Sequence, residues 1–179
     1  MKKPVQKSRI PEDKSFLIRE LKAPFFDVNW HFHSEYQLFV VLKGKGTRFI
    51  GNHMSSFKEG DMVLTGPNLP HLWRNDQEYF QIDSKLETHG IVIYFPDHFL
   101  QNAVFELNEF SSIANMLYKS SRGLEVQGKT NREITQMMKE LLKMEGVQSL
   151  IQLLTILEKI AQSEEYQIIA DAAYTNTFK

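Results

Sequence analysis

Hydrophobic and polar positions follow two different patterns along the chain. Before Pro96, short runs rich in Val, Ile, Leu, Phe and Thr are separated by glycine, proline and asparagine. Such runs predict short strands joined by tight turns, and a long succession of them favours a sandwich or a small barrel. The expected strands are 16–21, 25–33, 37–43, 47–50, 54–57, 62–65, 71–74, 79–82 and 90–95.

After Pro96 the apolar residues recur at the spacing of helices. Thr130 with Glu133 resembles a capping box, so one helix is expected to begin there. The sequence therefore predicts two parts: an N-terminal arm with a β-barrel over 1–95, and a helical appendage over 96–179 that ends in a linker. The elements expected in the second part are helices over 97–103, 111–119, 130–145 and 147–162, and one strand over 124–127.

The last predicted helix is apolar around much of its circumference. One stripe can pack on the barrel or on the preceding helix, and the other needs a further cover. A second copy of the chain supplies such a cover, which favours a homodimer, although burial within one domain is the alternative. The residues expected at the dimer interface are Leu150, Leu153, Leu154, Ile156, Leu157 and Ile160.

Composition narrows the class of protein. The 179 residues carry a formal net charge of −1, which gives no general attraction to nucleic acid or to an anionic membrane. There is no cysteine, so disulfides and thiolate chemistry are excluded, and a reducing cytoplasm is the expected location. No apolar run is long enough to span a bilayer or to act as a signal peptide.

Candidate chemistry gathers between residues 31 and 75. His31, His33 and Gln37 share one face if their strand runs on without a bulge, because successive side chains alternate. His71 can reach the same interior from another strand, and Trp73 shares its parity. A polar, imidazole-rich cluster inside a β shell is a metal site, a ligand pocket, or a set of buried histidines satisfied by their neighbours.

This stretch resembles the two motifs of the cupin superfamily. The first motif is met by His31-x-His33, Gln37 and Gly44, with Gln37 where the family has Glu. The second is met by Gly60, His71 and Asn75, with Gly66 and Asn68 in place of its Pro and Gly. The resemblance implies a mainly β fold with α, namely a cupin barrel (double-stranded β-helix, jelly-roll) followed by the C-terminal helical hairpin. Asn68 is a mild exchange, since Asn tolerates positive φ best after glycine.

The whole chain resembles the N-terminal regulatory domain of AraC-type transcription regulators. The resemblance rests on the runs at 31–38 and 71–75 and on the helices that follow. It implies a non-enzymatic dimer that senses a small polar effector, expected to be a sugar or a derivative, and reaches DNA through a further C-terminal domain. Residues 130–162 are not expected to read DNA themselves, because the second helix has Lys159 as its one basic residue.

A metal-dependent cupin enzyme, such as a dioxygenase or isomerase, is the alternative. Three histidines can hold a divalent transition metal, and His31, His33 and His71 would be its ligands together with Gln37. The neutral amide of Gln37 removes the negative charge that helps to hold a hard ion, and no positioned acid–base pair is evident. Both features favour the sensor, with His31, His33, Gln37, His71 and Trp73 as its ligand-binding residues. A dimerisation module with a vestigial pocket is a third hypothesis.

Overall fold

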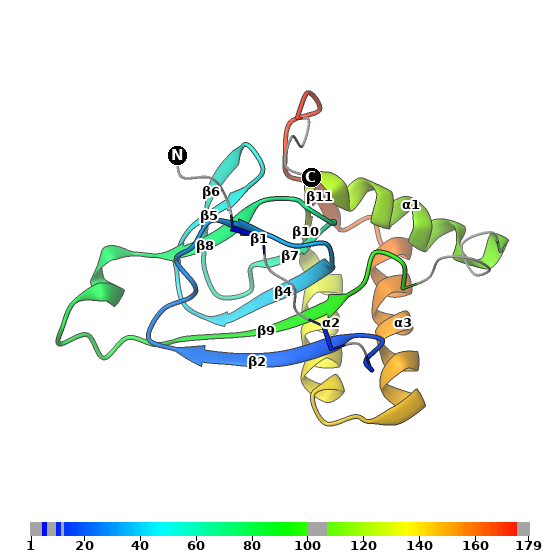
Figure 1. The fold of residues 1–179 in the computed structure, drawn as a ribbon, viewed down its shortest axis with the longest axis horizontal. Helices are drawn as coiled ribbons and strands as arrows, with labels where there is room; N and C mark the ends of the chain where they lie inside the picture. The colour runs from blue at the N-terminus through cyan, green and yellow to red at the C-terminus, as the bar shows by residue number, and fades with distance from the viewer. Residues whose placement is uncertain (1–4, 7–9, 12, 100–106, 175–179) are drawn as a thin grey trace.

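Two β-sheets face each other, and three α-helices lie at one end of them in the part of the chain that the structure describes (Figure 1). The structure is a computed structural model and describes residues 5, 6, 10, 11, 13–99 and 107–174. Within these residues no helix has the length and apolar character needed to cross a membrane.

The first sheet carries the motif residues His31, His71 and Asn75. Its strands are antiparallel except for the first pair, which is parallel. In spatial order they are β1 (Val5–Gln6), β3 (His31–Phe32), β8 (His71–Asn75), β5 (Gly46–Ile50) and β6 (His53–Phe57). Because β3 and β8 are neighbours, two segments 40 positions apart in the sequence bring their histidines to one place, with His31 paired to His71.

The second sheet is antiparallel and forms the opposite wall. Its strands, in spatial order, are β11 (Tyr166–Ile168), β10 (Leu124–Val126), β7 (Met62–Thr65), β4 (Tyr36–Lys43), β9 (Thr88–Phe95) and β2 (Leu17–Ala23). Strands β10 and β11 come from the second half of the chain. The predicted boundary near residue 95 therefore separates a mainly β segment from a mainly helical one, but residues on its two sides pack into the same sheet.

The central strands of the second sheet, β7, β4 and β9, are buried on both faces, and alternation along β4 decides which side chain meets which core. Leu38 and Val40 point to a core shared with the helices, whereas Phe39 and Val41 point into the space between the sheets. Gln37 has the parity of Phe39, so it enters the interior of the barrel as expected. Sheets covered on both faces read as continuous apolar runs, which explains the sequence of β4 and β9.

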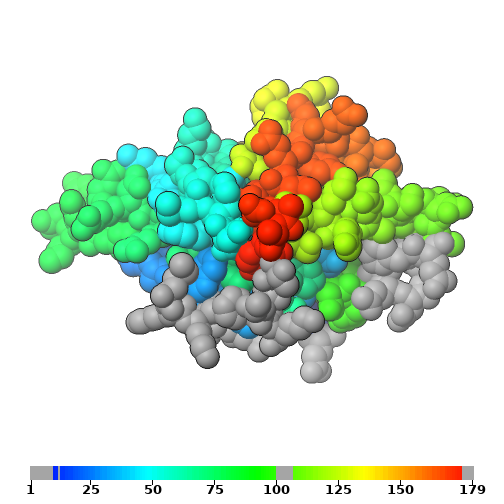
Figure 2. Space-filling view, turned by 90° about the horizontal axis from the view of Figure 1, so that it is seen from above, coloured from blue at the N-terminus to red at the C-terminus, as the bar shows by residue number. Residues whose placement is uncertain are grey.

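Three short 3₁₀ turns and three α-helices complete the described chain. They are η1 (Gln77–Phe80), η2 (Asn108–Phe110), α1 (Ser111–Lys119), η3 (Ser120–Arg122), α2 (Gly128–Leu141) and α3 (Gly146–Gln162). Figure 2 shows the C-terminal segment, in red, between the β5–β6 hairpin and α1. Asp171 in this segment donates its backbone N–H to the side-chain oxygen of Asn52, which anchors it to the hairpin.

Helix α3 packs within its own protomer, and this corrects part of the predicted dimer interface. Four of the six predicted interface side chains are fully buried in the core that α3 shares with α1, α2 and the second sheet: Leu153, Ile156, Leu157 and Ile160. Leu150 and Leu154 are only partly buried. Beside them, Val147 is 71% exposed and Ile151 is 48% exposed. The apolar stripe left on the surface of α3 is therefore Val147, Leu150, Ile151 and Leu154.

The start of α2 differs from the predicted capping box. The helix begins at Gly128, and the carboxylate of Glu165 accepts hydrogen bonds from the backbone N–H groups of Lys129 and Thr130. The Thr130 hydroxyl also donates to Glu165, at 2.7 Å. A carboxylate at this position satisfies helix N–H groups and is favoured by the helix dipole. The cap comes from 35 residues away, so the local pattern did not contain it.

Other differences from the sequence prediction are local. Only His31–Phe32 of the strand expected over 25–33 is a strand, and residues 77–80 form a 3₁₀ turn where a strand was expected over 79–82. The strand β11 was not predicted. Parts of the predicted arm, of the helix over 97–103 and of the linker fall on positions outside the described residues.

Candidate functional site

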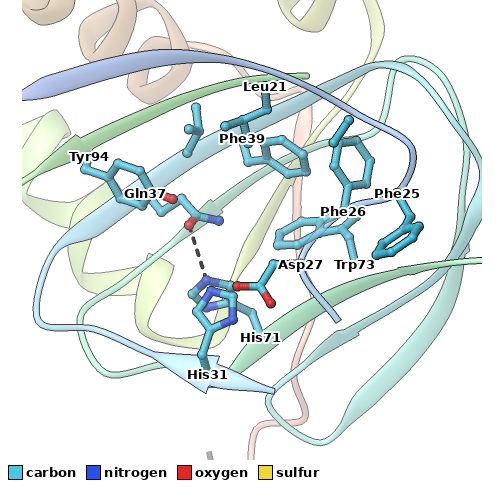
Figure 3. Close-up of a pocket in the computed structure, with 12 residues that line it drawn as sticks. Leu21, Phe25, Phe26, Asp27, His31, Gln37, Phe39, His71, Trp73 and Tyr94 are labelled. Atoms are coloured by element: carbon cyan, nitrogen blue, oxygen red, sulfur yellow. Dashed lines mark hydrogen bonds between the residues drawn. The ribbon is translucent and has the colours of Figure 1, made fainter. Parts of the chain in front are cut away.

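A cavity of about 190 Å³ lies between the two sheets (Figure 3). Most of its lining is apolar, and the aromatic rings of Phe26, Phe39, Trp73 and Tyr94 form much of the wall. Polar groups gather at one end. The complete lining is Leu21, Ala23, Phe25, Phe26, Asp27, His31, Gln37, Phe39, His71, Trp73, Val92 and Tyr94.

Three histidines converge at the polar end. One ring nitrogen from each of His31, His33 and His71 lies within 4.8 Å of one from each of the others, and all three residues are buried. His31 and His71 line the cavity, and His33 lies behind them, with its ring centroid 4.9 Å from that of His71. The structure thus brings together every residue that the sequence predicted for the site, including Gln37 and Trp73.

Backbone carbonyl groups orient the three imidazole rings. The Nδ1 atoms of His31, His33 and His71 lie 2.7, 2.9 and 2.7 Å from the carbonyl oxygens of Asn29, Glu35 and Leu69. A carbonyl oxygen only accepts, so Nδ1 is the nitrogen that carries hydrogen in each ring. In the neutral form each ring then presents the lone pair of Nε2. The carboxylate of Glu35, 3.6 Å from Nδ1 of His33, supports that ring from behind.

Gln37 closes the cluster from the opposite sheet. Its Oε1 lies 3.2 Å from Nε2 of His33 and 3.3 Å from Nε2 of His71. If both rings are neutral and carry hydrogen on Nδ1, the lone pairs of their Nε2 atoms point at Oε1 of Gln37. Neither Nε2 nor Oε1 could then donate a hydrogen bond. A cation, an added proton, or an amide turned to present its NH₂ group resolves that opposition. The first two of these would place positive charge at the polar end of the cavity, whereas the turned amide would supply the donor from within the protein.

The donor set fits a divalent transition metal. Imidazole nitrogens suit zinc, nickel, copper and iron, and Nδ1–H bonds to carbonyl groups are the usual outer support of metal-binding histidines. His31, His33 and His71, with the Gln37 oxygen, are the residues that would hold the ion. All four donors are neutral, so a bound ion would keep its full charge and attract an anionic group.

The sequence profile of the cupin domain family matches residues 21–80. These residues include β3 to β8, which carry the three histidines and Gln37. The chain contains a cupin domain. The predicted fold class, a mainly β cupin shell followed by a C-terminal helical region, is thereby confirmed.

Proteins similar to this chain cover different parts of it. An uncharacterised protein of Aquifex aeolicus is 39% identical over 49 residues, which are 27% of this chain and 40% of that protein. The structure of ToxT from Vibrio cholerae aligns with a TM-score of 0.52 and 13% identity, covering 89% of this chain and 61% of the ToxT chain. That similarity is one of fold, and it extends over both the cupin shell and the helices.

A third similarity is to CuxR, described as an AraC-like transcriptional activator. It has a TM-score of 0.47 and 11% identity, and covers 74% of this chain and 46% of the CuxR chain. This chain therefore spans less than two thirds of the length of the Aquifex protein, of ToxT and of CuxR.

The motif residues of the cupin domain that do not face the cavity shape its loops. Asn68 has φ of 60°, the left-handed conformation that glycine adopts most easily, so the exchange predicted to be mild is accommodated. Asn75 accepts a 2.8 Å hydrogen bond from the backbone N–H of Phe26 and donates to the carbonyl of Lys45. Asn75 thus holds the segment that places Phe26 and Asp27 at the cavity.

A buried ionic cluster beside the cavity was missed by the sequence analysis. Arg48 on β5 pairs with Asp61 and with Glu125, and Asp61 also accepts a 2.8 Å hydrogen bond from the indole of Trp73. One signal was present: Gly46, Arg48 and Ile50 share the inward parity of β5. An arginine at an inward position requires buried acidic partners, but the sequence does not say which.

The pH dependence of the free energy of unfolding should reveal the raised pKa of Asp61. Burial raises the pKa of Asp61 to about 6 from its ordinary 3.8, even though Arg48 and the Trp73 N–H oppose this effect. Between about pH 4 and pH 6 the folded protein then holds a proton that the unfolded chain has lost, so stability falls as pH rises through this window. The contribution is about 3 kcal/mol. In urea unfolding, the stability of the wild type relative to Asp61→Asn should decline over that window, and a constant difference would contradict the assignment.

Proposed function

We propose that this chain is a non-enzymatic effector-sensing domain of an AraC-type transcription regulator, with the cupin cavity as its effector site. The observation that carries the proposal is an aromatic cavity whose polar end is formed by His31, His71 and Gln37. The fold similarity to ToxT over 89% of the chain supports a shared arrangement of shell and helices. Contact with DNA would belong to a separate domain.

The cavity favours a small effector with one ring and one polar group. A dry apolar cavity of roughly 150 Å³ holds a benzene molecule, so about 190 Å³ suits a single ring with a short substituent. The rings of Phe39 and Trp73, in edge contact at 4.8 Å, offer an apolar wall for it. The polar group of the effector would meet the histidine end. An acidic group gains most there if the cluster carries a proton or a metal ion.

The sugar expected from the sequence fits this lining less well. A pyranose presents several hydroxyl groups around its ring, and each one buried without a partner costs about 1–3 kcal/mol. The polar side chains of the lining, Asp27, His31, Gln37 and His71, lie close together at one end (Figure 3). They can satisfy one edge of a sugar while the remaining hydroxyls would face aromatic rings. We therefore place an aromatic acid ahead of a sugar as the effector class.

Benzoate is the simplest probe of this proposal. We expect it to bind with one site per chain in isothermal titration calorimetry, whereas glucose and arabinose produce no heat at the same concentrations. His71→Ala should weaken benzoate at least about tenfold, because it removes a hydrogen bond to a charged group. His89→Ala, a partly exposed histidine of β9 that lies outside the lining, is the matched control and should bind as the wild type does. Sugar binding without benzoate binding would reverse the proposed effector class.

A metal-dependent enzyme is the second candidate, and the converging histidines favour it. A bound divalent ion would supply a Lewis acid at the polar end of the cavity, held by His31, His33, His71 and Gln37. If so, dialysis against zinc yields one ion per chain and His33→Ala abolishes binding. Gln37→Glu should tighten zinc about tenfold by adding a negative charge, while Gln81→Glu, on an exposed turn, should not. Zinc bound equally by wild type and His33→Ala would rule out this site.

We also propose that the regulator is a homodimer through the exposed stripe of α3 defined above. Val147, Leu150, Ile151 and Leu154 follow helical spacing and stand on one side of the helix. The buried side of α3 already has its partners in the protomer. The smaller interface replaces the six-residue interface expected from the sequence.

A further inference from the structure

We propose that Asp61 and Arg48 are positioning residues of the cavity, and that the hydrogen-bonded chain Trp73–Asp61–Arg48–Glu125 couples the cavity wall to the first turn of α2. As a device for sensing an effector this inference rests on the proposed function, but the coupling itself is testable without any ligand. The chain runs from the first sheet to the second and ends where the helical part of the molecule begins.

The cavity end of the chain is the indole of Trp73. Its Nε1 donates to Oδ2 of Asp61 at 2.8 Å, while its ring contacts Phe39 and His71 edge-on, with centroids 4.8 and 5.9 Å away. These edge contacts between rings are not directed hydrogen bonds, so they permit the indole to slide. The single directed bond, from the indole N–H to Asp61, therefore fixes the angle at which Trp73 meets the cavity.

The middle of the chain is a buried guanidinium. Arg48 lies opposite Trp73 in the pairing of β5 with β8, so both side chains leave the same face of the sheet. Its three nitrogens are engaged by Asp61, Glu125 and the Ser55 hydroxyl. Arg48 and Asp61 are 3% and 7% exposed at their side chains. Buried charges in this setting move together, because separating them uncovers a charge in a medium of low dielectric.

The far end of the chain reaches α2 at two points. Glu125 accepts a 3.2 Å hydrogen bond from the side chain of Gln127, the residue directly before α2, and the backbone oxygen of Gln127 accepts from the N–H of Asn131. The side chain of Asn131 in turn donates to the carbonyl of Gly60 at 2.8 Å, next to Asp61. The first turn of α2 is thus tied both to the end of the chain and to the turn that carries Asp61.

The coupling that we propose uses two arrangements of the chain: the one in the structure, with the indole–Asp61 bond made, and one with that bond broken. A molecule that rotates Trp73 breaks that bond and leaves Asp61 to its remaining partner Arg48, which changes the strength of the Arg48–Glu125 pair. Coupling between two sites requires such an element whose equilibrium both sites bias. By reciprocity, if breaking the indole–Asp61 bond changes the free energy of the Arg48–Glu125 pair, a change at that pair must change the free energy of the indole–Asp61 bond by the same amount.

Two measurements test the coupling in opposite directions on the full chain. In a Trp30→Phe background Trp73 is the sole tryptophan, so Glu125→Gln should shift its emission maximum. Glu140→Gln, the same exchange at an exposed position of α2, is the matched control and should leave the emission unchanged. In hydrogen exchange, Trp73→Phe removes the indole N–H, and residues 128–134 should exchange about fivefold faster relative to α3.

The control for hydrogen exchange is Phe39→Leu, which alters the same wall without touching the hydrogen-bonded chain. It should change exchange in α2 and α3 alike, since its effect is a general loss of packing. Equal behaviour of Trp73→Phe and Phe39→Leu, or an unchanged emission in Glu125→Gln, would overturn the coupling. Neither result depends on benzoate or zinc, so the coupling and the proposed effector site can fail independently.

Discussion

Arg48→Met is expected to lower the free energy of unfolding by about 3–5 kcal/mol at neutral pH. Methionine keeps much of the side-chain volume on β5 but removes the cation between Asp61 and Glu125. Asp61 would then be buried with only the Trp73 N–H as a donor among the contacts described above, and its pKa would rise further because Arg48 no longer lowers it. Urea unfolding followed by circular dichroism measures the loss directly.

Two controls separate the buried charge from a general loss of packing. Arg74→Met, on the exposed side of the neighbouring strand, should change stability by less than about 0.5 kcal/mol. The loss in Arg48→Met should shrink as pH falls, because Asp61 takes up a proton and no longer needs the cation, and without Arg48 this uptake begins above the wild-type pKa of about 6. A loss that is small at every pH would mean that the three charges are solvated in solution.

The shell and the members of the site were accessible from the sequence, but the predicted reason for their convergence was wrong. His31 lies on β3 of the first sheet and Gln37 on β4 of the second, so they do not share the face of one continuous strand, and they meet because the two sheets face each other. His71 was expected to reach the same interior from another strand, and the pairing of that strand with the strand of His31 is given by the structure. Trp73 was predicted to face the same interior because it lies two residues after His71 on one strand.

Features decided by long-range pairing were not accessible. The Glu165 cap of α2 and the strand β11 depend on a return of the chain to β10 that no local pattern encodes. The segment before His31 is apolar enough to be a strand, yet Asn75 holds Phe26 in a loop over the cavity. The nature of the cavity likewise depends on Tyr94 and Phe26, which arrive from segments that the motifs do not include.

In the last helix the predicted apolar positions are correct, but the surface predicted to cover most of them is wrong. Two apolar faces were recognised on 147–162, and both exist. The sequence could not tell that α1 and α2 together enclose Leu153, Ile156 and Leu157, because the packing of α1 against α3 is a tertiary contact that the pattern of neither helix specifies. Only the remaining stripe is left for a second copy.

Leu157→Ala should therefore lower the free energy of unfolding, whereas Ile151→Glu should dissociate the dimer. Leu157 is fully buried in the core, and its truncation leaves a cavity that the surrounding helices cannot fill, so we expect a loss of about 2–5 kcal/mol in urea unfolding. Ile151 is 48% exposed, so glutamate at that position is solvated in the protomer. It should cost the monomer less than about 1 kcal/mol.

Sedimentation velocity over a range of protein concentrations completes the comparison. Ile151→Glu places a charge in the centre of the proposed interface, where the two introduced carboxylates would face each other across a two-fold axis or meet an apolar surface, and either arrangement is unfavourable. We expect the wild type to sediment as a dimer and Ile151→Glu as a folded monomer. Gln148→Glu, which adds the same charge at an exposed position of the helix to one side of the stripe, should remain dimeric. A monomeric wild type would remove the interface from the proposed function and leave the buried side of α3, tested by Leu157→Ala, unaffected.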